Sequence, residues 1–173
     1  LFDNAYGVYD GKQIIEGQEV VLKTSKLSTE DFRYIRFYHF LQQMMWTKKW
    51  YYDYLKFLKN NGIHPVTVFN KIIEKCKKDK GDIGNLYSEF MKDYNEAESF
   101  DSFKKLEKYW FSESNFNRLK AGNYGKLNML YTFKLVLNHR NAFNKFILDI
   151  SKEYATNLEL DVESCVRYSD YVV

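Results

Sequence analysis

The sequence has little proline, glycine and cysteine, and each shortage excludes a class of protein. Its 173 residues include one proline and eight glycines, too few for a flexible linker or a collagen-like fibre. The two cysteines, Cys76 and Cys165, lie far apart. They cannot build a disulfide framework or an iron–sulfur cluster, which needs about four thiolates. We therefore expect free thiols and a reducing, cytoplasmic setting.

Long apolar runs and local reaction motifs are also missing. No stretch approaches the roughly 18 apolar residues of a membrane-spanning helix, and no secretory signal pattern is visible. The three histidines, His39, His64 and His139, stand in neither HxxxH nor HxxE spacing. No GxxxxGK[ST] phosphate loop occurs. These absences exclude a locally encoded metal motif and a Walker-type NTPase, and we expect no membrane partner.

Aromatic residues are what the chain has in excess. They make up 18% of the sequence, and nearly all are Phe or Tyr. Large rings bury much apolar area, so this composition favours a packed core over disorder. The length fits one domain. Apolar residues recur mostly at helical spacing, which predicts a mainly α fold: a compact multi-helix domain with a small β-ribbon.

The stretch from Leu27 to Gly62 is predicted to form the centre of this domain. Ser28 and Asp31 make a helix-start signal of the capping-box type, and Asn61-Gly62 is a helix-stop signal. Apolar residues cover most of the circumference in between, which is typical of a helix surrounded by others. We expect a helical hairpin or one kinked helix. Its thin polar strip holds the candidate functional residues Arg33, Arg36, His39 and Gln43.

Residues 1–26 are predicted to form an N-terminal arm. We expect an irregular lead-in over residues 1–11, followed by a hairpin or extended arm with two short β-branched runs, Gln13–Ile15 and Glu19–Lys23. A two-stranded ribbon is marginal in water. The arm should therefore pack on the helices or on something outside this chain.

The helical domain is predicted to span residues 27–157. Pro65 suits the first position of a helix, and Lys126–Tyr154 is predicted to be a second core helix, bent near residues 138–141. Residues 158–173 form a C-terminal tail whose partial alternation suggests a strand beside the arm.

Several groups of reactive side chains have a plainer structural interpretation. His39 beside Arg36 could be a buried switch or a ligand to an unseen partner, but a structural histidine is the more frequent case. Cys165 would need a neighbouring base to act as a nucleophile, and the sequence argues for none. The segment 122–126 could bind an anion before a long helix, but a tight turn between two helices is the favoured interpretation. Lys48–Tyr52 could stack nucleotides, but its spacing fits a core better.

Paired carboxylates select no reaction either. Glu30 and Asp31 suit the first turn of a helix, where negative charge is favourable. The pairs Glu96 with Glu98 and Asp161 with Glu163 are interpreted as solvated surface. A glycosidase needs two such groups at a defined separation, and nothing in the sequence singles out a pair.

A series of residue patterns resembles a known family. NAYGVYDG is followed by EVV, then by TxxLSxEDFxxIRFYHFL, WxKxWYYDYLK and, far downstream, GxYGKLNxxYTxKL. The series resembles the region after the catalytic barrel in large radical S-adenosylmethionine proteins, notably those with an N-terminal cobalamin-binding domain. The resemblance covers nearly all of the chain and is densest over Asn4–Leu58.

The resemblance implies a non-catalytic C-terminal helical domain that covers the barrel and shapes substrate access. The CxxxCxxC and DxHxxG motifs of the family are absent here, so it assigns no catalytic, cofactor-binding or metal-binding residue to this chain. An iron–sulfur cluster, S-adenosylmethionine and cobalamin would belong to the parent protein, whose barrel is the expected partner. We also expect a fragment, because the chain starts at Leu1 rather than at methionine. Exposed aromatics of the central helices would face the barrel.

Two alternatives remain open at this stage. The chain could be a free-standing helical module that binds a protein partner, or itself, through its aromatic surface. Less favoured is a nucleic-acid binder that uses Lys75–Lys80 and Lys48–Tyr52, because the formal charge of +3 is nearly balanced.

Overall fold

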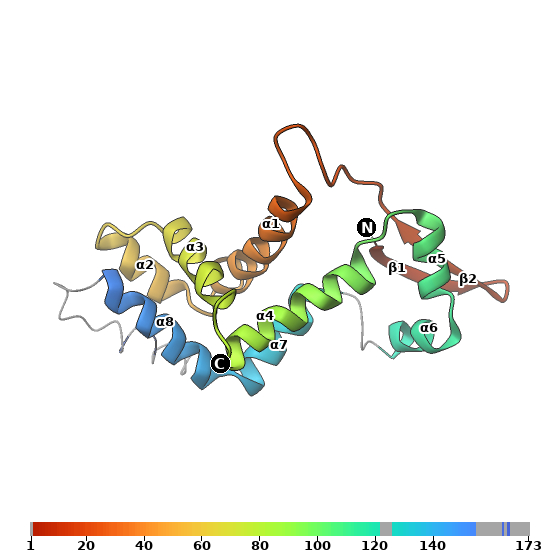
Figure 1. The fold of residues 1–173 in the computed structure, drawn as a ribbon. Helices are drawn as coiled ribbons and strands as arrows, with labels where there is room; N and C mark the ends of the chain where they lie inside the picture. Colours follow the sequence, from red (N-terminus) through yellow and green to blue (C-terminus); the bar gives the residue numbers. More distant parts are fainter. Residues whose placement is uncertain (1, 122–125, 155–163, 165, 167–173) are drawn as a thin grey trace.

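The fold is mainly α, as predicted (Figure 1). We describe a computed structural model of residues 2–121 and 126–154, together with Ser164 and Val166. These residues form eight α-helices, two short π-helical segments and one two-stranded antiparallel sheet. Within these ranges, no helix combines the length and the apolar character needed to cross a membrane.

The elements follow the chain as β1 (Phe2–Tyr9), β2 (Lys12–Gly17), α1 (Thr29–Leu41), η1 (Gln42–Thr47), α2 (Tyr52–Asn60), α3 (Pro65–Cys76), α4 (Asp82–Asp93), η2 (Tyr94–Glu98), α5 (Phe103–Trp110), α6 (Glu113–Lys120), α7 (Leu127–Asn138) and α8 (Arg140–Tyr154). Here η marks a π-helical segment. The hairpin, α5 and α6 lie at one end of the molecule, and α2, α3 and α8 lie at the other (Figure 1).

The central stretch forms two helical parts, over 29–47 and 52–60, with a break between them. The Ser28 hydroxyl accepts a hydrogen bond from the Asp31 backbone N–H at 3.0 Å, and the Asp31 carboxylate accepts one from the Ser28 N–H at 2.8 Å, which confirms the capping box. Helix α1 widens into η1, and the path then breaks at Lys49, whose φ is +64°. It resumes as α2 and stops before Gly62, where φ is +84°.

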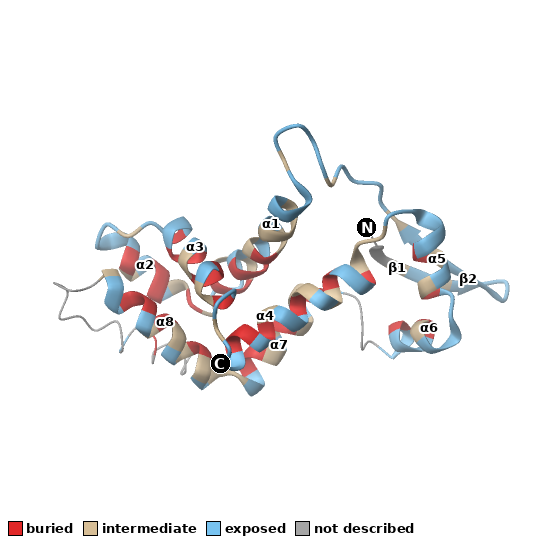
Figure 2. Ribbon diagram, in the orientation of Figure 1, coloured by how far each residue is buried: buried red, intermediate tan, exposed pale blue. Residues whose placement is uncertain are grey.

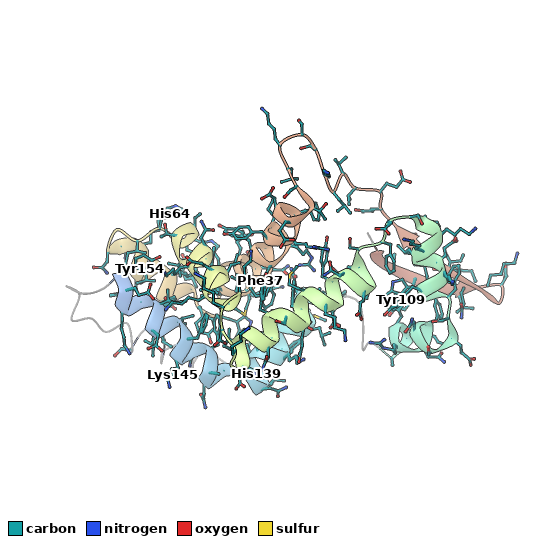
Figure 3. All side chains as sticks on the ribbon, in the orientation of Figure 1. Phe37, His64, Tyr109, His139, Lys145 and Tyr154 are labelled. Atoms are coloured by element: carbon teal, nitrogen blue, oxygen red, sulfur yellow. The ribbon has the colours of Figure 1, made fainter. Side chains whose placement is uncertain are left out.

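The large core surrounds this central stretch. Phe37, Phe40 and Tyr131 each place a ring 5.1 Å from the ring of Phe90, so α1, α4 and α7 meet through one aromatic cluster. Phe37 is labelled in Figure 3, where α1 approaches α4. Figure 2 shows buried residues along α2, α4 and α8, on the sides where these helices pack.

The hairpin differs from its predicted position. Strand β1 occupies the segment predicted to be irregular, and it pairs with β2 through a turn in which Asp10 and Gly11 both have positive φ, +50° and +74°. That is the type I′ geometry which Asp-Gly favours in tight hairpins. Of the two alternatives for Glu19–Lys23, a hairpin or an extended arm, the hairpin strand is wrong: this segment has no strand structure and lies in the exposed loop before α1 (Figure 2). It has β-branched residues but no partner strand.

The ribbon packs on α5 and α6, which is how a marginal two-stranded sheet becomes stable. Ile15 is buried in a second core of six residues, and the Tyr6 hydroxyl donates to the Leu119 carbonyl at 2.7 Å. Trp110 lies in the same core and donates its indole N–H to the Ala97 carbonyl at 3.1 Å. The described residues therefore form two hydrophobic cores, the smaller of which holds the hairpin.

The predicted second core helix is broken where the bend was expected. Helices α7 and α8 meet at His139, whose φ and ψ of −126° and 13° are not helical. The predicted tail strand at 158–173 lies outside the described residues, apart from Ser164 and Val166. Both are helical, and Val166 is buried in the large core.

Candidate functional site

The structure brings together two of the four polar-strip residues and separates the others. Arg36 and Gln43 line one cleft. Arg33 bonds instead to Glu30 at 3.1 Å and to Asn95 at 3.2 Å, on the exposed surface. His39 is also exposed. Arg36 and Gln43 are therefore the strip residues around which a site can form.

Arg36 is held by a partly buried ion pair with Glu98. Its Nε donates to Oε2 at 3.1 Å, and its Nη2 donates to Oε2 at 2.9 Å and to Oε1 at 3.2 Å. The two side chains are only 15% and 13% exposed. The guanidinium carbon also lies 5.1 Å from the ring centre of Phe90 and 5.8 Å from that of Tyr94. Such charge-assisted bonds and ring contacts fix the orientation of the guanidinium.

Asn128 on α7 extends this pair into a network. Arg36 Nη1 donates to Asn128 Oδ1 at 2.5 Å, and Asn128 Nδ2 donates to Gln43 Oε1 at 2.6 Å. The Asn128 backbone carbonyl accepts from the Thr132 hydroxyl at 2.7 Å. Side chains from α1, η1, η2 and α7 thus form one connected set, which we call the polar network: Arg36, Gln43, Glu98 and Asn128.

Two members of the polar network were missed in the sequence. Glu98 was interpreted as solvated surface, and this was wrong because η2 brings it against Arg36, 62 residues away along the chain. Asn128 is the Asn of the GKLN pattern, so a signal for it existed. Both Gln43 and Glu98 come from π-helical segments. Such segments are rare and occur frequently at functional sites.

The polar network lines a cleft of about 560 Å³. This volume is within the usual range for small-molecule pockets, roughly 300–1,000 Å³. The other lining residues are of two kinds. The polar or cationic ones are Lys48, Lys126 and Thr132, and the apolar ones are Trp50, Leu127, Met129 and Phe133. The cleft therefore combines an oriented polar floor with large apolar walls.

One face of α7 is unusually apolar for an exposed surface. Met129, Phe133 and Leu137 follow one another at intervals of four residues, which places them on one face of the helix. They are 52%, 50% and 76% exposed. We call these three residues the α7 face. Its first two members also line the cleft, so the face and the cleft are continuous.

The histidines do not converge. His64 caps α3, where its Nδ1 accepts from the Val66 N–H at 3.2 Å, and His139 lies at the junction of α7 and α8 (Figure 3). The His139 Nδ1 is buried and has no hydrogen-bond partner in the part of the chain that the structure describes. Among the described residues, no three His, Cys, Asp or Glu side chains are placed to hold a metal ion. The segment 122–125, weighed as an anion site, lies outside the described residues.

The basic-aromatic segment Lys48–Tyr52 is divided between core and cleft. Tyr51 is buried and packs against Phe143. Trp50 is half-buried and lines the cleft. The Lys49 ammonium lies 5.9 Å from the ring of Tyr52. The aromatic rings therefore form no continuous stacking surface at this segment.

Cys76 should be chemically inert in the folded protein. Burial raises the pKa of its thiol to about 12, and the thiolate is the reactive form. In a Cys165→Ser variant, we expect Ellman's reagent to label Cys76 at least about a hundredfold more slowly in native buffer than in guanidinium, because labelling requires local opening. Rapid labelling in native buffer, without loss of helical signal, would show that α3 does not bury this thiol.

Comparison of the chain with family models, with curated proteins and with solved structures gives no match.

Proposed function

We propose that this chain is a non-catalytic accessory domain of a larger radical S-adenosylmethionine enzyme, where it covers the barrel and shapes substrate access. The α7 face carries the docking part of this proposal. Three large apolar side chains at half exposure or more are costly to leave in water, and such patches mark surfaces that another protein covers. The motif series supports the choice of parent enzyme.

The motif residues lie at positions that organise the fold, which is what a shared domain would require. The Asp10-Gly11 of NAYGVYDG makes the hairpin turn. The LSxEDF pattern holds the capping box of α1, and GKLN supplies Asn128 of the polar network. The patterns that suggest the family therefore coincide with a turn, a cap and a site.

The face assigned to the barrel differs from the one expected. The sequence suggested exposed aromatics of the central helices, but Phe40, Tyr51 and Tyr54 of that stretch are buried. The α7 face replaces them, with Trp50 of the central stretch beside it in the cleft. We also propose a cytoplasmic location, since Cys76 is a free thiol.

The test is the coding sequence that precedes Leu1. We expect a barrel with three clustered cysteines there, and we expect the longer protein to bind an iron–sulfur cluster when it is purified without oxygen with iron and sulfide. The same treatment of this chain alone should give no cluster absorbance. A cluster bound by the chain alone, or an open reading frame that starts near Leu1, would refute the proposal.

The second candidate is a free-standing interaction module, because the α7 face would serve a separate protein partner or a second copy equally well. Size-exclusion chromatography of the chain and of Phe133→Glu separates the cases. Self-association that the substitution abolishes favours a module that binds a second copy, whereas a monomer at all concentrations excludes the second copy and leaves the barrel or a separate protein as the partner.

A further inference from the structure

We propose that the cleft between α1, η1, η2 and α7 binds a small amphipathic anion: a carboxylate or phosphate group on an apolar or aromatic body. This inference concerns the cleft of this chain by itself and does not depend on which parent enzyme is proposed, although Met129 and Phe133 of its lining also belong to the α7 face assigned to docking. Three independent features of the cleft support it: its unused hydrogen-bond donors, its charge and its apolar walls.

In the polar network, the side-chain oxygens already accept hydrogen bonds, whereas a donor group remains for a ligand. Both Glu98 carboxylate oxygens accept from Arg36, Asn128 Oδ1 accepts from Arg36, and Gln43 Oε1 accepts from Asn128. The Gln43 amide nitrogen makes no hydrogen bond to another described residue. A ligand that supplies acceptor oxygens would pair this group, whereas a ligand that supplies donors would find few oxygens left.

The charge of the cleft selects the sign of the ligand. Arg36, Lys48 and Lys126 line it, against the single carboxylate of Glu98. Glu98 is already neutralised by Arg36 at 2.9 Å, so Lys48 adds net positive charge to the lining of the cleft. A partly enclosed cleft with apolar walls strengthens such a field relative to open water.

The apolar walls select the body of the ligand. Trp50, Met129 and Phe133 offer ring and thioether surface next to the polar network. Aromatic and apolar ligand groups bind such walls, whereas a small ion such as inorganic phosphate would leave these side chains exposed to water. The cleft therefore fits one molecule with both parts, with its anionic group towards the polar network.

The polar network is also preorganised for binding. Arg36 is fixed by Glu98 and by the rings of Phe90 and Tyr94, and it in turn fixes Asn128. Groups that are already ordered lose little entropy when a ligand arrives, so binding to them is stronger than binding to mobile side chains.

The experiment titrates the ¹⁵N-labelled chain with four probes: phenyl phosphate, phenylacetate, phenethylammonium and inorganic phosphate. We expect saturable shifts of the Trp50 indole and of the Gln43 and Asn128 amides with at least one aromatic anion, at a dissociation constant on the order of 1 mM or tighter. Phenethylammonium and inorganic phosphate should bind at least roughly tenfold more weakly. Whichever aromatic anion binds more tightly, the phosphate or the carboxylate, identifies the anionic group that the cleft prefers.

Two charge reversals test the place of binding. Lys48→Glu at the cleft should raise the dissociation constant of the aromatic anion by roughly fivefold or more. Lys145→Glu is the matched control, because Lys145 is exposed on α8 and does not line the cleft (Figure 3). Unchanged amide shifts elsewhere in the spectrum show that both variants fold.

Three results would overturn the proposal. The first is equal binding of phenethylammonium, which would remove the preference for an anion. The second is equal binding of inorganic phosphate, which would show that the apolar part of the ligand contributes nothing to binding. The third is an absence of saturable shifts at the cleft that Lys48→Glu weakens and Lys145→Glu does not.

Discussion

Replacing Phe90 by alanine should lower the free energy of unfolding by about 4 kcal/mol. Phe90 is fully buried, and its ring contacts those of Phe37, Phe40 and Tyr131. Alanine would leave a cavity at the point where α1, α4 and α7 meet. It would also remove the ring beneath the Arg36 guanidinium. The measurement is urea unfolding followed by circular dichroism.

The control for Phe90→Ala is Phe133→Ala, which removes the same ring from a side chain that is 50% exposed. We expect a change within about 0.5 kcal/mol, as for most surface substitutions. Similar losses at the two positions, or a loss below about 1 kcal/mol at Phe90, would contradict the packing described for this core.

Replacing Arg36 by alanine should cost about 3 kcal/mol of stability, because the Glu98 carboxylate would stay largely out of water without its partner. The cost is at the lower end for a buried pair, since both side chains keep some solvent contact. Glu98→Ala should be similarly destabilising. In the double variant, the two losses should be clearly less than additive, because neither charge is then left alone.

Arg33→Ala is the matched control for Arg36→Ala, because Arg33 lies on the same helix and pairs with Glu30 at 3.1 Å in an exposed position. Such surface pairs contribute about 0–1 kcal/mol. Equal effects of Arg33→Ala and Arg36→Ala would mean that the polar network does not hold the helices together. Additive losses in the Arg36 and Glu98 double variant would mean that the two side chains are not coupled.

Local signals predicted much of the helical fold. The capping box at Ser28 and Asp31, the stop at Gly62 and the proline that begins α3 are all in place. These features depend on residues within one helical turn, so sequence spacing suffices. The N-cap of α5 is likewise local: the Ser102 hydroxyl accepts from the Lys105 N–H.

The hairpin shows where local signals fail. Residues 1–11 contain the turn-favouring residues Asn4, Gly7 and Asp10-Gly11, and only Asp10-Gly11 forms a turn between strands. The β-branched residues at 19–23 looked like a strand and are exposed loop. Strand formation depends on a pairing partner and on packing, which for β2 come from β1 and α5.

Only the two residues of the polar network that lie on the central stretch could be predicted, for a similar reason. Arg36 and Gln43 are seven residues apart, so they point almost the same way from a helix. Arg33 and His39 lie about 60° to either side of Arg36, far enough to leave the cleft. Glu98 and Asn128 are distant along the chain, and only the folded structure brings them to Arg36.

Oxidation of the methionines by peroxide tests the docking proposal most directly. Met129 is 52% exposed on the α7 face, while Met44 and Met45 are fully buried and serve as internal controls. In this chain alone, Met129 should be oxidised roughly tenfold faster than either control. In a longer protein that includes the barrel, the account predicts that the rate at Met129 falls to near that of Met44 and Met45. Equally rapid oxidation of Met129 in the folded longer protein would contradict it.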